Sequence, residues 1–180
     1  MKFDVKPDYV VTLNNDNYYI YIFTVEGELE KAITSINKVN NGLNRIVQIV
    51  KCDSVLSLRQ LVLAVYHTIK SFKKGRNIAR KPYLELLLRL SGQKQIKNAL
   101  ESIGLPPKAT KACLIMVLHE DHKGSLQELL CRLKSLNIKL TRDSKEYPIV
   151  LAILKKGVDP RKILDVEKEH IAKSALLDLL

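Results

Sequence analysis

The chain has 180 residues, of which 46% are hydrophobic and 27% charged, a globular composition that argues against a long disordered tail. No apolar run approaches the roughly 20 residues that cross a bilayer, and the first residues lack the apolar core of a signal peptide, so we expect a soluble, cytoplasmic protein. The formal net charge of +11 makes nucleic acid the first class of partner to consider, ahead of an anionic membrane surface or simple solvation.

The first third of the chain is predicted to form strands and one helix. Residues 10–13 and 18–23 are short aromatic and β-branched runs, and the Asn- and Asp-rich stretch between them predicts a hairpin turn. Residues 28–39 have apolar side chains at helical spacing and are followed by an Asn-Asn-Gly stop. Residues 46–50, with the sequence IVQIV, then predict an inner strand.

The middle of the chain is predicted to be helical. Residues 54–74 are predicted to form a long helix, because their apolar side chains recur at helical spacing, and Gly75 marks its end. Pro82 favours the start of the next helix, and residues 83–90 are apolar on nearly every side, so we expect this short helix to be buried. Gly92 is predicted to end it.

Helices and strands alternate in the remainder of the chain. Residues 96–103 and 126–133 have amphipathic helical spacing, whereas residues 112–118 have the length and composition of a buried strand. A short segment follows at residues 138–140, and residues 148–180 predict two or three further helices. This order predicts an α/β fold around one core, in a chain that has the usual size of a single domain.

The usual motifs of catalysis, cofactor binding and metal binding are missing from the sequence. The seven glycines lie at least twelve residues apart, which excludes the glycine-rich loops that bind nucleotides. His119 and His122 lack a third ligand at the usual spacing, so a polar strand-to-helix connection is favoured over a metal site. The cysteines are widely spaced and predicted to be reduced core residues: Cys52, Cys113 and Cys131. We expect no enzyme activity, cofactor or metal, although an active site assembled from distant residues stays open as an alternative.

Positive charge is concentrated between His67 and Lys111. This segment holds eleven basic and two acidic residues, which gives +9 of the net +11. A solvated surface normally mixes both signs, so a segment of one sign favours an anionic ligand over a plain basic face. The lysines at the end of the 54–74 helix also suit the negative end of the helix dipole, and that part of the charge needs no ligand.

Within this segment, Ser91, Gly92 and Gln93 form the predicted junction between two helices. The first N–H groups of the second helix are unpaired and form a natural anion site, which Lys94 and Lys97 flank. Gly92 removes the side chain that would block a phosphate or a base, and the neighbouring glutamines are able to read base edges. The alternative is structural, with Ser91 as a helix N-cap and Gly92 as a helix stop, and the spacing alone leaves both open.

The stretch from Arg76 to Gly104 closely resembles the TPRKB family, whose members are the kinase-binding subunits of the KEOPS complex. The resemblance rests on the run NIA at residues 77–79 and on ELLLRLSGQKQI at residues 85–96, and it is weaker elsewhere. Lys94 stands where the family usually has arginine, which keeps the charge but loses bidentate hydrogen bonding.

The resemblance implies a noncatalytic subunit with one α/β domain, residues 1–180, in which helices flank a mixed β-sheet. KEOPS transfers a threonylcarbamoyl group to the adenosine beside the anticodon of certain tRNAs, with catalysis in its ATPase-like subunit. Family members dock on the N-terminal lobe of a small Bud-type kinase, and archaeal and fungal-type members look like the part that captures the single-stranded CCA end of tRNA. The implied partners are tRNA, this kinase and, indirectly, the other KEOPS subunits. The alternative is a protein-only adapter that supports the kinase without contacting RNA.

The tRNA site is predicted in the basic segment. Six basic side chains are expected to contact phosphates: Lys73, Lys74, Arg76, Arg80, Lys94 and Lys97. The neighbouring polar, small and apolar residues are expected to contact bases: Asn77, Ser91, Gly92, Gln93, Gln95 and Ile96.

The kinase-facing surface is predicted at the end of the chain, where residues 175–179 also resemble the family. Several leucines crowd this terminus and would leave an apolar patch in water unless the fold or a partner covers them. Burial within the protein itself is the alternative. A separate apolar stripe argues against burial of the leucines, because it already gives this helix a side that faces the core: Ile163, Val166, Ile171 and Ala175. The predicted contact residues are Ala175, Leu176, Leu177, Leu179 and Leu180.

Overall fold

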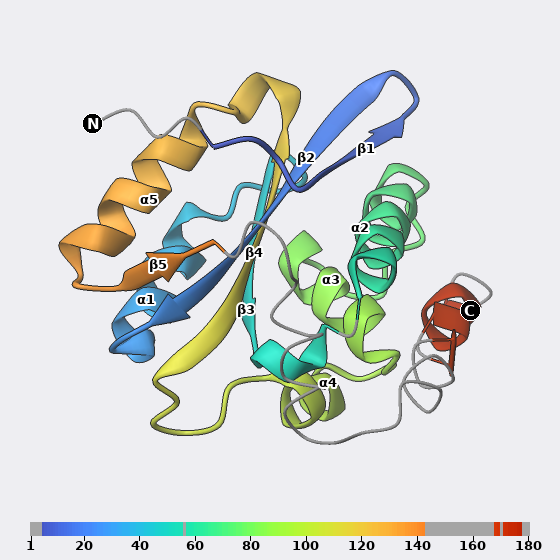
Figure 1. The fold of residues 1–180 in the computed structure, drawn as a ribbon. Helices are drawn as coiled ribbons and strands as arrows, with labels where there is room; N and C mark the ends of the chain where they lie inside the picture. The colour runs from blue at the N-terminus through green and yellow to red at the C-terminus, as the bar shows by residue number, and fades with distance from the viewer. Residues whose placement is uncertain (1–4, 56, 143–167, 170, 178–180) are drawn as a thin grey trace. The chain divides into compact units, whose positions relative to one another are not determined.

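The computed structural model describes residues 5–55, 57–142, 168–169 and 171–177 (Figure 1). The chain divides into two compact units, which are described separately. The sheet unit comprises Met1–Val50 and Leu105–Arg142, and the helical unit comprises Lys51–Gly104 and Asp143–Leu180. Strands and helices are both abundant, so the predicted α/β class is confirmed.

The sheet unit is built around five strands: β1 (Tyr9–Leu13), β2 (Asp16–Glu26), β3 (Arg45–Val50), β4 (Lys111–His119) and β5 (Lys139–Thr141). Four of them lie in the order β1-β2-β4-β3, and β5 pairs with the last residues of β2. The described strand pairs are all antiparallel, so the sheet is antiparallel where the resemblance implied a mixed one. The runs of β-branched and aromatic residues predict these strands, because such side chains fit a pleated and buried surface.

The hairpin between β1 and β2 is confirmed. Asn14 and Asn15 form its turn and both have positive φ, 53° and 68°, which is the conformation that a two-residue type I′ turn requires. Asparagine enters this left-handed region more readily than most residues. The hairpin register places Tyr18 of β2 opposite Val11 of β1, and on its other side Tyr18 lies opposite His119 of β4.

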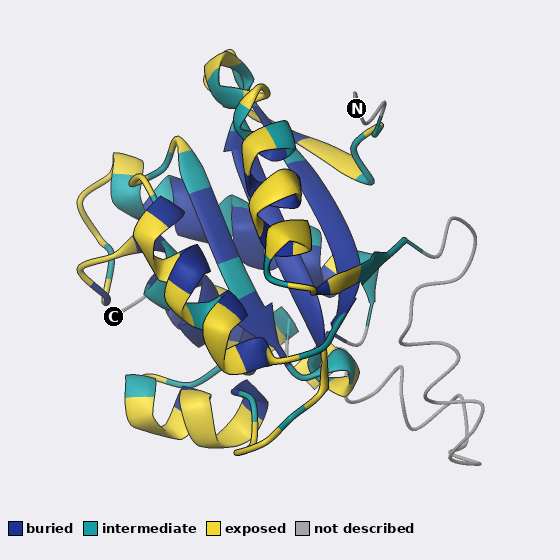
Figure 2. Cartoon of the chain, turned by 90° about the vertical axis from the view of Figure 1, so that its left-hand side faces the viewer, coloured by how far each residue is buried: buried dark blue, intermediate teal, exposed yellow. Residues whose placement is uncertain are grey.

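Two amphipathic helices, α1 (Leu29–Val39) and α5 (Ser125–Ser135), pack on one face of the sheet (Figure 1). Their buried sides share one core cluster with the strands, and the helix residues of this cluster are Leu29, Ala32, Ile36, Val39, Leu126, Leu129, Leu130 and Leu133. The opposite sides of both helices are exposed, as Figure 2 shows. Burial of one stripe is what the helical spacing predicts.

The helical unit contains the short 3-10 helix η1 (Cys52–Ser54) and the helices α2 (Leu58–Lys73), α3 (Pro82–Ser91) and α4 (Ile96–Ile103). Residues 168–169 and 171–177 are also helical and are called the C-terminal helix below. Helix α3 packs against α2 and α4. Its leucines at 86, 87, 88 and 90 have no exposed surface, so the prediction of a buried core helix is confirmed.

Helix α2 begins later than the sequence predicts. Ser57 is its N-cap, and the Ser57 hydroxyl accepts a hydrogen bond of 3.0 Å from the Gln60 N–H. A serine cap of this kind satisfies one of the free N–H groups of the first turn. The predicted start at residue 54 falls in η1 instead.

Two further predictions need correction. The three cysteines were all predicted to be core residues, but only Cys113 is buried; Cys52 is half-buried and Cys131 is exposed. Cys131 is exposed because it lies outside the apolar stripe of α5. Leu100 is one of the apolar residues that give residues 96–103 their predicted amphipathic spacing, but its side chain is 50% exposed. The short helix α4 buries only Ala99 and Ile103. The helices predicted between residues 148 and 167 lie outside the described residues.

Candidate nucleic-acid interface

The predicted tRNA-contacting residues all belong to the helical unit, where they form two groups. Residues 73–80, called the basic loop here, connect α2 to α3, and residues 91–97, called the helix junction, connect α3 to α4. The side-chain amide of Gln60, near the start of α2, donates a hydrogen bond of 3.0 Å to the Leu90 carbonyl near the end of α3. The two helices are therefore antiparallel, and the basic loop and the helix junction lie at opposite ends of α3.

The length of α3 sets the spacing of these groups. This helix has ten residues, and a helix rises about 1.5 Å per residue, so it is about 15 Å long. The predicted tRNA-contacting residues therefore form two groups that are separated by about the length of α3. They suit an extended ligand better than a compact one.

Basic side chains of the loop point to the surface. Lys73 ends α2, Lys74 caps it, and both are exposed, as are Arg76 and Arg80. Gly75 has φ of +65° and reverses the chain, as predicted for a helix stop. The loop therefore presents four cationic side chains to water.

Backbone contacts hold the loop from its inner side. The carboxylate oxygen Oε2 of Glu85 accepts hydrogen bonds from the N–H groups of Ile78 and Ala79, at 2.9 and 2.7 Å. The Arg76 N–H donates to the Ser71 carbonyl at 2.8 Å. The Asn77 amide donates to the Ala79 carbonyl at 3.0 Å, so part of its predicted capacity for bases is used within the loop.

Glu85 belongs to a fully buried ion pair. Its Oε1 accepts hydrogen bonds from Nε and Nη2 of Arg89, one turn later on α3, at 3.0 and 2.9 Å, and neither side chain has exposed surface. The Nη1 group of Arg89 donates to the Ser174 carbonyl of the C-terminal helix at 3.0 Å. Burial of both charges is tolerated because each is paired and hydrogen-bonded. Arg89 thus does not contribute to the cationic surface.

At the helix junction, Ser91 ends one helix and does not begin another. Its hydroxyl donates to the Leu88 carbonyl at 3.1 Å and accepts from the Gln93 N–H at 3.3 Å, and the residue is buried. Gly92 follows with φ of +65° as the C-cap of α3. The prediction of Gly92 as a helix stop is confirmed, whereas Ser91 as an N-cap is wrong because α4 begins only after Gln95.

The space beside Gly92 is taken by the protein itself. A β-carbon placed on Gly92 would lie 2.8 Å from the β-carbon of Lys173, in the C-terminal helix. The sequence alone left two roles open for Gly92, the approach of a phosphate or base and a purely structural helix stop. In the structure Lys173 of the C-terminal helix occupies this space, so the missing side chain of Gly92 allows the two helices to pack closely.

The accessible part of the helix junction lies just after Gly92. Lys94, Gln95 and Lys97 are exposed, and Gln93 and Ile96 are half-buried. Gln95 is the N-cap of α4 but makes no side-chain hydrogen bond to the first turn. The N–H groups at this helix start therefore face an environment that favours an anion, with two lysines beside them.

The predicted kinase-contacting residues are divided by burial. Ala175 and Leu176 are exposed, Leu176 to 57%, whereas Leu177 is buried. Ala175 was also assigned to an inward stripe, which its exposure contradicts, because the C-terminal helix turns Ser174 and Leu177 inward instead. Leu179 and Leu180 lie outside the described residues, as do Ile163 and Val166.

The sheet unit gathers one group of potential metal ligands around His119. Its ring lies near the carboxylates of Asp16 and Asp121, at 3.7 and 3.3 Å, and Glu120 completes a group whose ligand atoms with Asp16 and His119 lie within 4.8 Å of one another. Asn17 donates to Glu120 at 2.8 Å. Structural zinc sites use four ligands rich in Cys and His, so we interpret this group as polar contacts that close the strand-to-helix connection.

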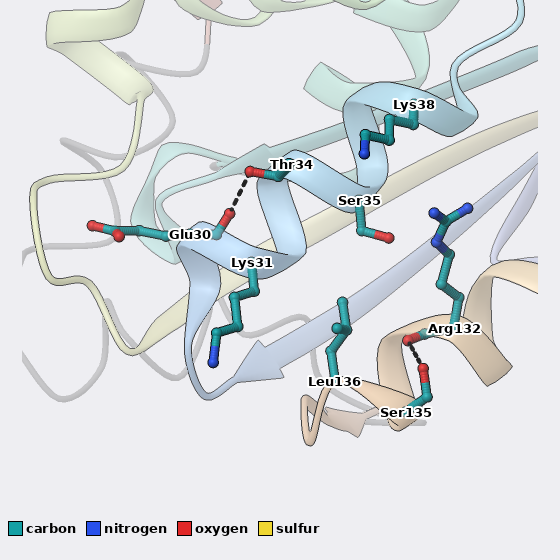
Figure 3. A pocket seen from close by; sticks show the side chains of 8 residues that line it. All are labelled: Glu30, Lys31, Thr34, Ser35, Lys38, Arg132, Ser135 and Leu136. Atoms are coloured by element: carbon teal, nitrogen blue, oxygen red, sulfur yellow. Dashed lines mark hydrogen bonds between the residues drawn. The ribbon is translucent and has the colours of Figure 1, made fainter.

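An open groove of about 510 Å³ lies between α1 and α5 of the sheet unit (Figure 3). Its hydroxyl groups at Thr34 and Ser135 donate to the backbone carbonyls of Glu30 and Arg132 in their own helices. The groove is lined by Glu30, Lys31, Thr34, Ser35, Lys38, Arg132, Ser135 and Leu136. None of these residues was predicted to contact tRNA or the kinase. The groove is therefore no part of the candidate interface.

Three residues that organise the interface were not predicted from the sequence: Glu85, Arg89 and Lys173. A signal for the first two was present, because opposite charges four residues apart stand inside an otherwise apolar helix. A charged pair in such a place predicts a buried ion pair. Lys173 carried no local signal, because its contact with Gly92 joins distant parts of the sequence.

Comparison with known proteins places the chain in a family. Residues 25–168 match the sequence profile described as "Kinase binding protein CGI-121". The protein named KEOPS complex subunit Cgi121 of Pyrococcus abyssi is 39% identical to the chain over 79 residues, which cover 43% of the chain and 43% of that relative. Among the described residues, no helix has both the length and the apolar character needed to cross a membrane. Since the profile spans most of the sequence, the chain belongs to the CGI-121 family of kinase-binding proteins.

Proposed function

We propose that this protein is a noncatalytic, cytoplasmic subunit of a KEOPS complex that binds the single-stranded CCA end of tRNA and docks on the small Bud-type kinase of that complex. Its contribution is to hold tRNA for the threonylcarbamoyl transfer that another subunit catalyses. The relationship to the CGI-121 family and to a KEOPS subunit of Pyrococcus abyssi supports the assembly.

The observation that favours RNA is the set of cations at both ends of α3. Five of them are exposed and make no ion pair with any residue that the structure describes: Lys74, Arg76, Arg80, Lys94 and Lys97. A surface cation near a carboxylate is partly neutralised, whereas these keep their attraction for an anion. A polyanion that reaches both ends of a helix about 15 Å long is the simplest ligand.

A single strand fits this surface better than a duplex. Ile78 lies between Arg76 and Arg80 and is 41% exposed, so it offers an apolar contact to an unstacked base. The exposed amide of Gln95 and the free helix start beside it offer hydrogen-bond donors and acceptors. Proteins read single-stranded RNA by combining phosphate contacts with apolar and polar contacts to bases that are out of the stack.

Docking on the kinase is proposed for the exposed side of the C-terminal helix. Leu176 is 57% exposed, and Ala175 beside it is exposed as well. A large exposed leucine is a common contact in protein interfaces when it lies in an apolar patch. The family's description as kinase-binding proteins supports a partner of this class.

Binding of tRNA with and without its CCA tail tests the proposal. We expect the purified protein to bind intact tRNA, and removal of the tail to abolish most of this binding. The affinity should fall steeply with salt, because cations that contact phosphates release counterions from the RNA. Equal binding with and without the tail would contradict the proposed site, and the absence of any tRNA binding would favour a protein-only adapter.

A reconstituted complex tests the noncatalytic role. We expect no ATPase or transferase turnover from the protein alone, and a higher yield of threonylcarbamoyladenosine when it is added to the other subunits. Turnover by the isolated chain would overturn this part of the proposal.

A further inference from the structure

One buried ion pair contacts both the basic loop and the C-terminal helix. The carboxylate of Glu85 accepts from two successive N–H groups of the loop, those of Ile78 and Ala79, at 2.9 and 2.7 Å. The guanidinium of Arg89 donates to that carboxylate and, through Nη1, to the Ser174 carbonyl at 3.0 Å. Hydrogen bonds therefore run without a gap from the loop at one end of α3 to the helix that covers the other end.

Stability alone gives little reason for such a pair. Removing two charges from water costs several kcal/mol for each ion, and well-packed apolar residues in their place are often neutral or stabilising. Glu85 and Arg89 are both fully buried in a helix that is otherwise rich in leucine. What apolar residues cannot supply is the directed hydrogen bonding to Ile78, Ala79 and Ser174.

From this geometry we propose that Glu85 and Arg89 are positioning residues of the tRNA site; this inference rests on the function proposed above. Glu85 fixes the basic loop, and Arg89 fixes the C-terminal helix over the helix junction. Neither side chain contacts RNA, because neither reaches the surface.

The direction of each loop residue follows from the Glu85 contacts. Ala79 is turned inward and is 3% exposed, whereas Ile78 is 41% exposed and Arg80 is exposed. A loop held by its N–H groups in this way loses little conformational freedom when a ligand binds. Such preorganisation raises affinity by lowering the entropic cost of binding.

Arg89 acts at the other end of α3. Its hydrogen bond to Ser174 holds the C-terminal helix where the adjacent Lys173 packs against Gly92. The helix junction begins at this contact, so its exposed lysines are presented from a fixed support. One ion pair thereby sets the position of both groups of tRNA-contacting residues.

A double substitution, Glu85→Leu with Arg89→Met, tests the proposal. It removes both charges together, so no unpaired charge stays buried. We expect the full-length variant to fold, the amides of Ile78 and Ala79 to lose protection from hydrogen exchange, and the affinity for intact tRNA to fall about tenfold or more. The matched control is Leu87→Met, a volume-conserving change at another fully buried position of α3; it should leave exchange of the loop amides and tRNA affinity unchanged.

The outcomes separate this proposal from the proposed function. A folded double variant that binds tRNA as tightly as the wild type overturns the positioning role. If the double variant does not fold, Arg89→Lys decides, because it keeps the charge beside Glu85 but loses the fork that reaches Ser174; unchanged tRNA affinity in that variant overturns the role of Arg89. If the wild type itself binds no tRNA, the proposed function fails, whereas hydrogen exchange still shows whether Glu85 holds the loop.

Discussion

Gly92 and Lys173 lie so close together that a β-carbon on Gly92 would meet the β-carbon of Lys173 at 2.8 Å. Real β-carbons essentially never approach this closely, so one of the two backbones would have to move. Gly92 also has φ of +65°, where any other residue is strained. The conformation of α3 at its end and the place of the C-terminal helix thus both depend on this glycine.

Gly92→Ala should therefore destabilise the protein more than its backbone strain alone predicts. The left-handed conformation costs alanine about 1 kcal/mol relative to glycine, and the contact with Lys173 should bring the loss in the free energy of unfolding to about 2–3 kcal/mol. The matched control is Gly75→Ala, because Gly75 has the same φ of +65° but nothing within 4 Å of the added carbon. Denaturant titration measures both, and equal losses would contradict the packing role of Gly92.

Charge reversal at the helix junction should weaken tRNA binding without unfolding the protein. Lys94 and Lys97 are exposed, so Lys94→Glu with Lys97→Glu should lower tRNA affinity by about tenfold or more at low salt and reduce its salt dependence. The control, Lys38→Glu with Lys134→Glu, makes the same charge change on exposed residues of the sheet unit. An unchanged affinity in the folded Lys94 and Lys97 variant would exclude the helix junction from the site.

Local patterns predicted the secondary structure of the described chain well. The hairpin followed from Asn14 and Asn15, whose left-handed conformations suit a tight turn. The end of α3 followed from Gly92, and its burial followed from its leucines. These features depend on neighbours in the sequence, so a periodic pattern or a turn residue is enough to show them.

The candidate site was predicted less well, because its organisation depends on distant contacts. No local pattern shows that Lys173 covers Gly92 or that the Ser174 carbonyl receives a hydrogen bond from Arg89. The count of eleven basic residues between His67 and Lys111 therefore includes Arg89, although its side chain is buried. The sequence-based prediction also joined the basic loop and the helix junction into one site, although the ten residues of α3 separate them.

A carboxylate in the sheet unit, Glu26, should have a pKa below its ordinary value. Glu26 lies between two lysines on neighbouring strands, at 3.0 Å from Lys111 and 3.6 Å from Lys139. The pKa of Glu26 is lowered below its ordinary value of 4.5, mainly by the hydrogen bond and the charge of Lys111 and to a smaller extent by Lys139. Its contribution to stability is therefore present above that value and is lost as pH falls through the lowered pKa of the folded state.

Titration of Glu26 by NMR measures this effect. Lys111→Met should raise the pKa of Glu26 towards its ordinary value more than Lys139→Met does, because Lys111 is closer and is the larger cause. High salt should reduce the difference, since exposed charges are screened. A pKa that is the same in both variants and in the wild type would show that the two ion pairs do not persist in solution.

The last prediction concerns the C-terminal helix, where two neighbouring leucines should give opposite results. Leu176 is 57% exposed and Leu177 is 3% exposed, so removal of the chain after Ser174 would confuse a lost contact surface with a lost core residue. Leu176→Asp should weaken kinase binding about tenfold or more while the melting temperature and tRNA affinity stay unchanged, because a charge in an apolar interface is costly and a charge in water is not. Leu177→Ala should instead lower the free energy of unfolding by about 2–4 kcal/mol, as expected for a buried leucine. Kinase affinity from calorimetry and the melting temperature of each variant give the answer: if Leu176→Asp binds the kinase normally, the docking surface lies elsewhere on the protein.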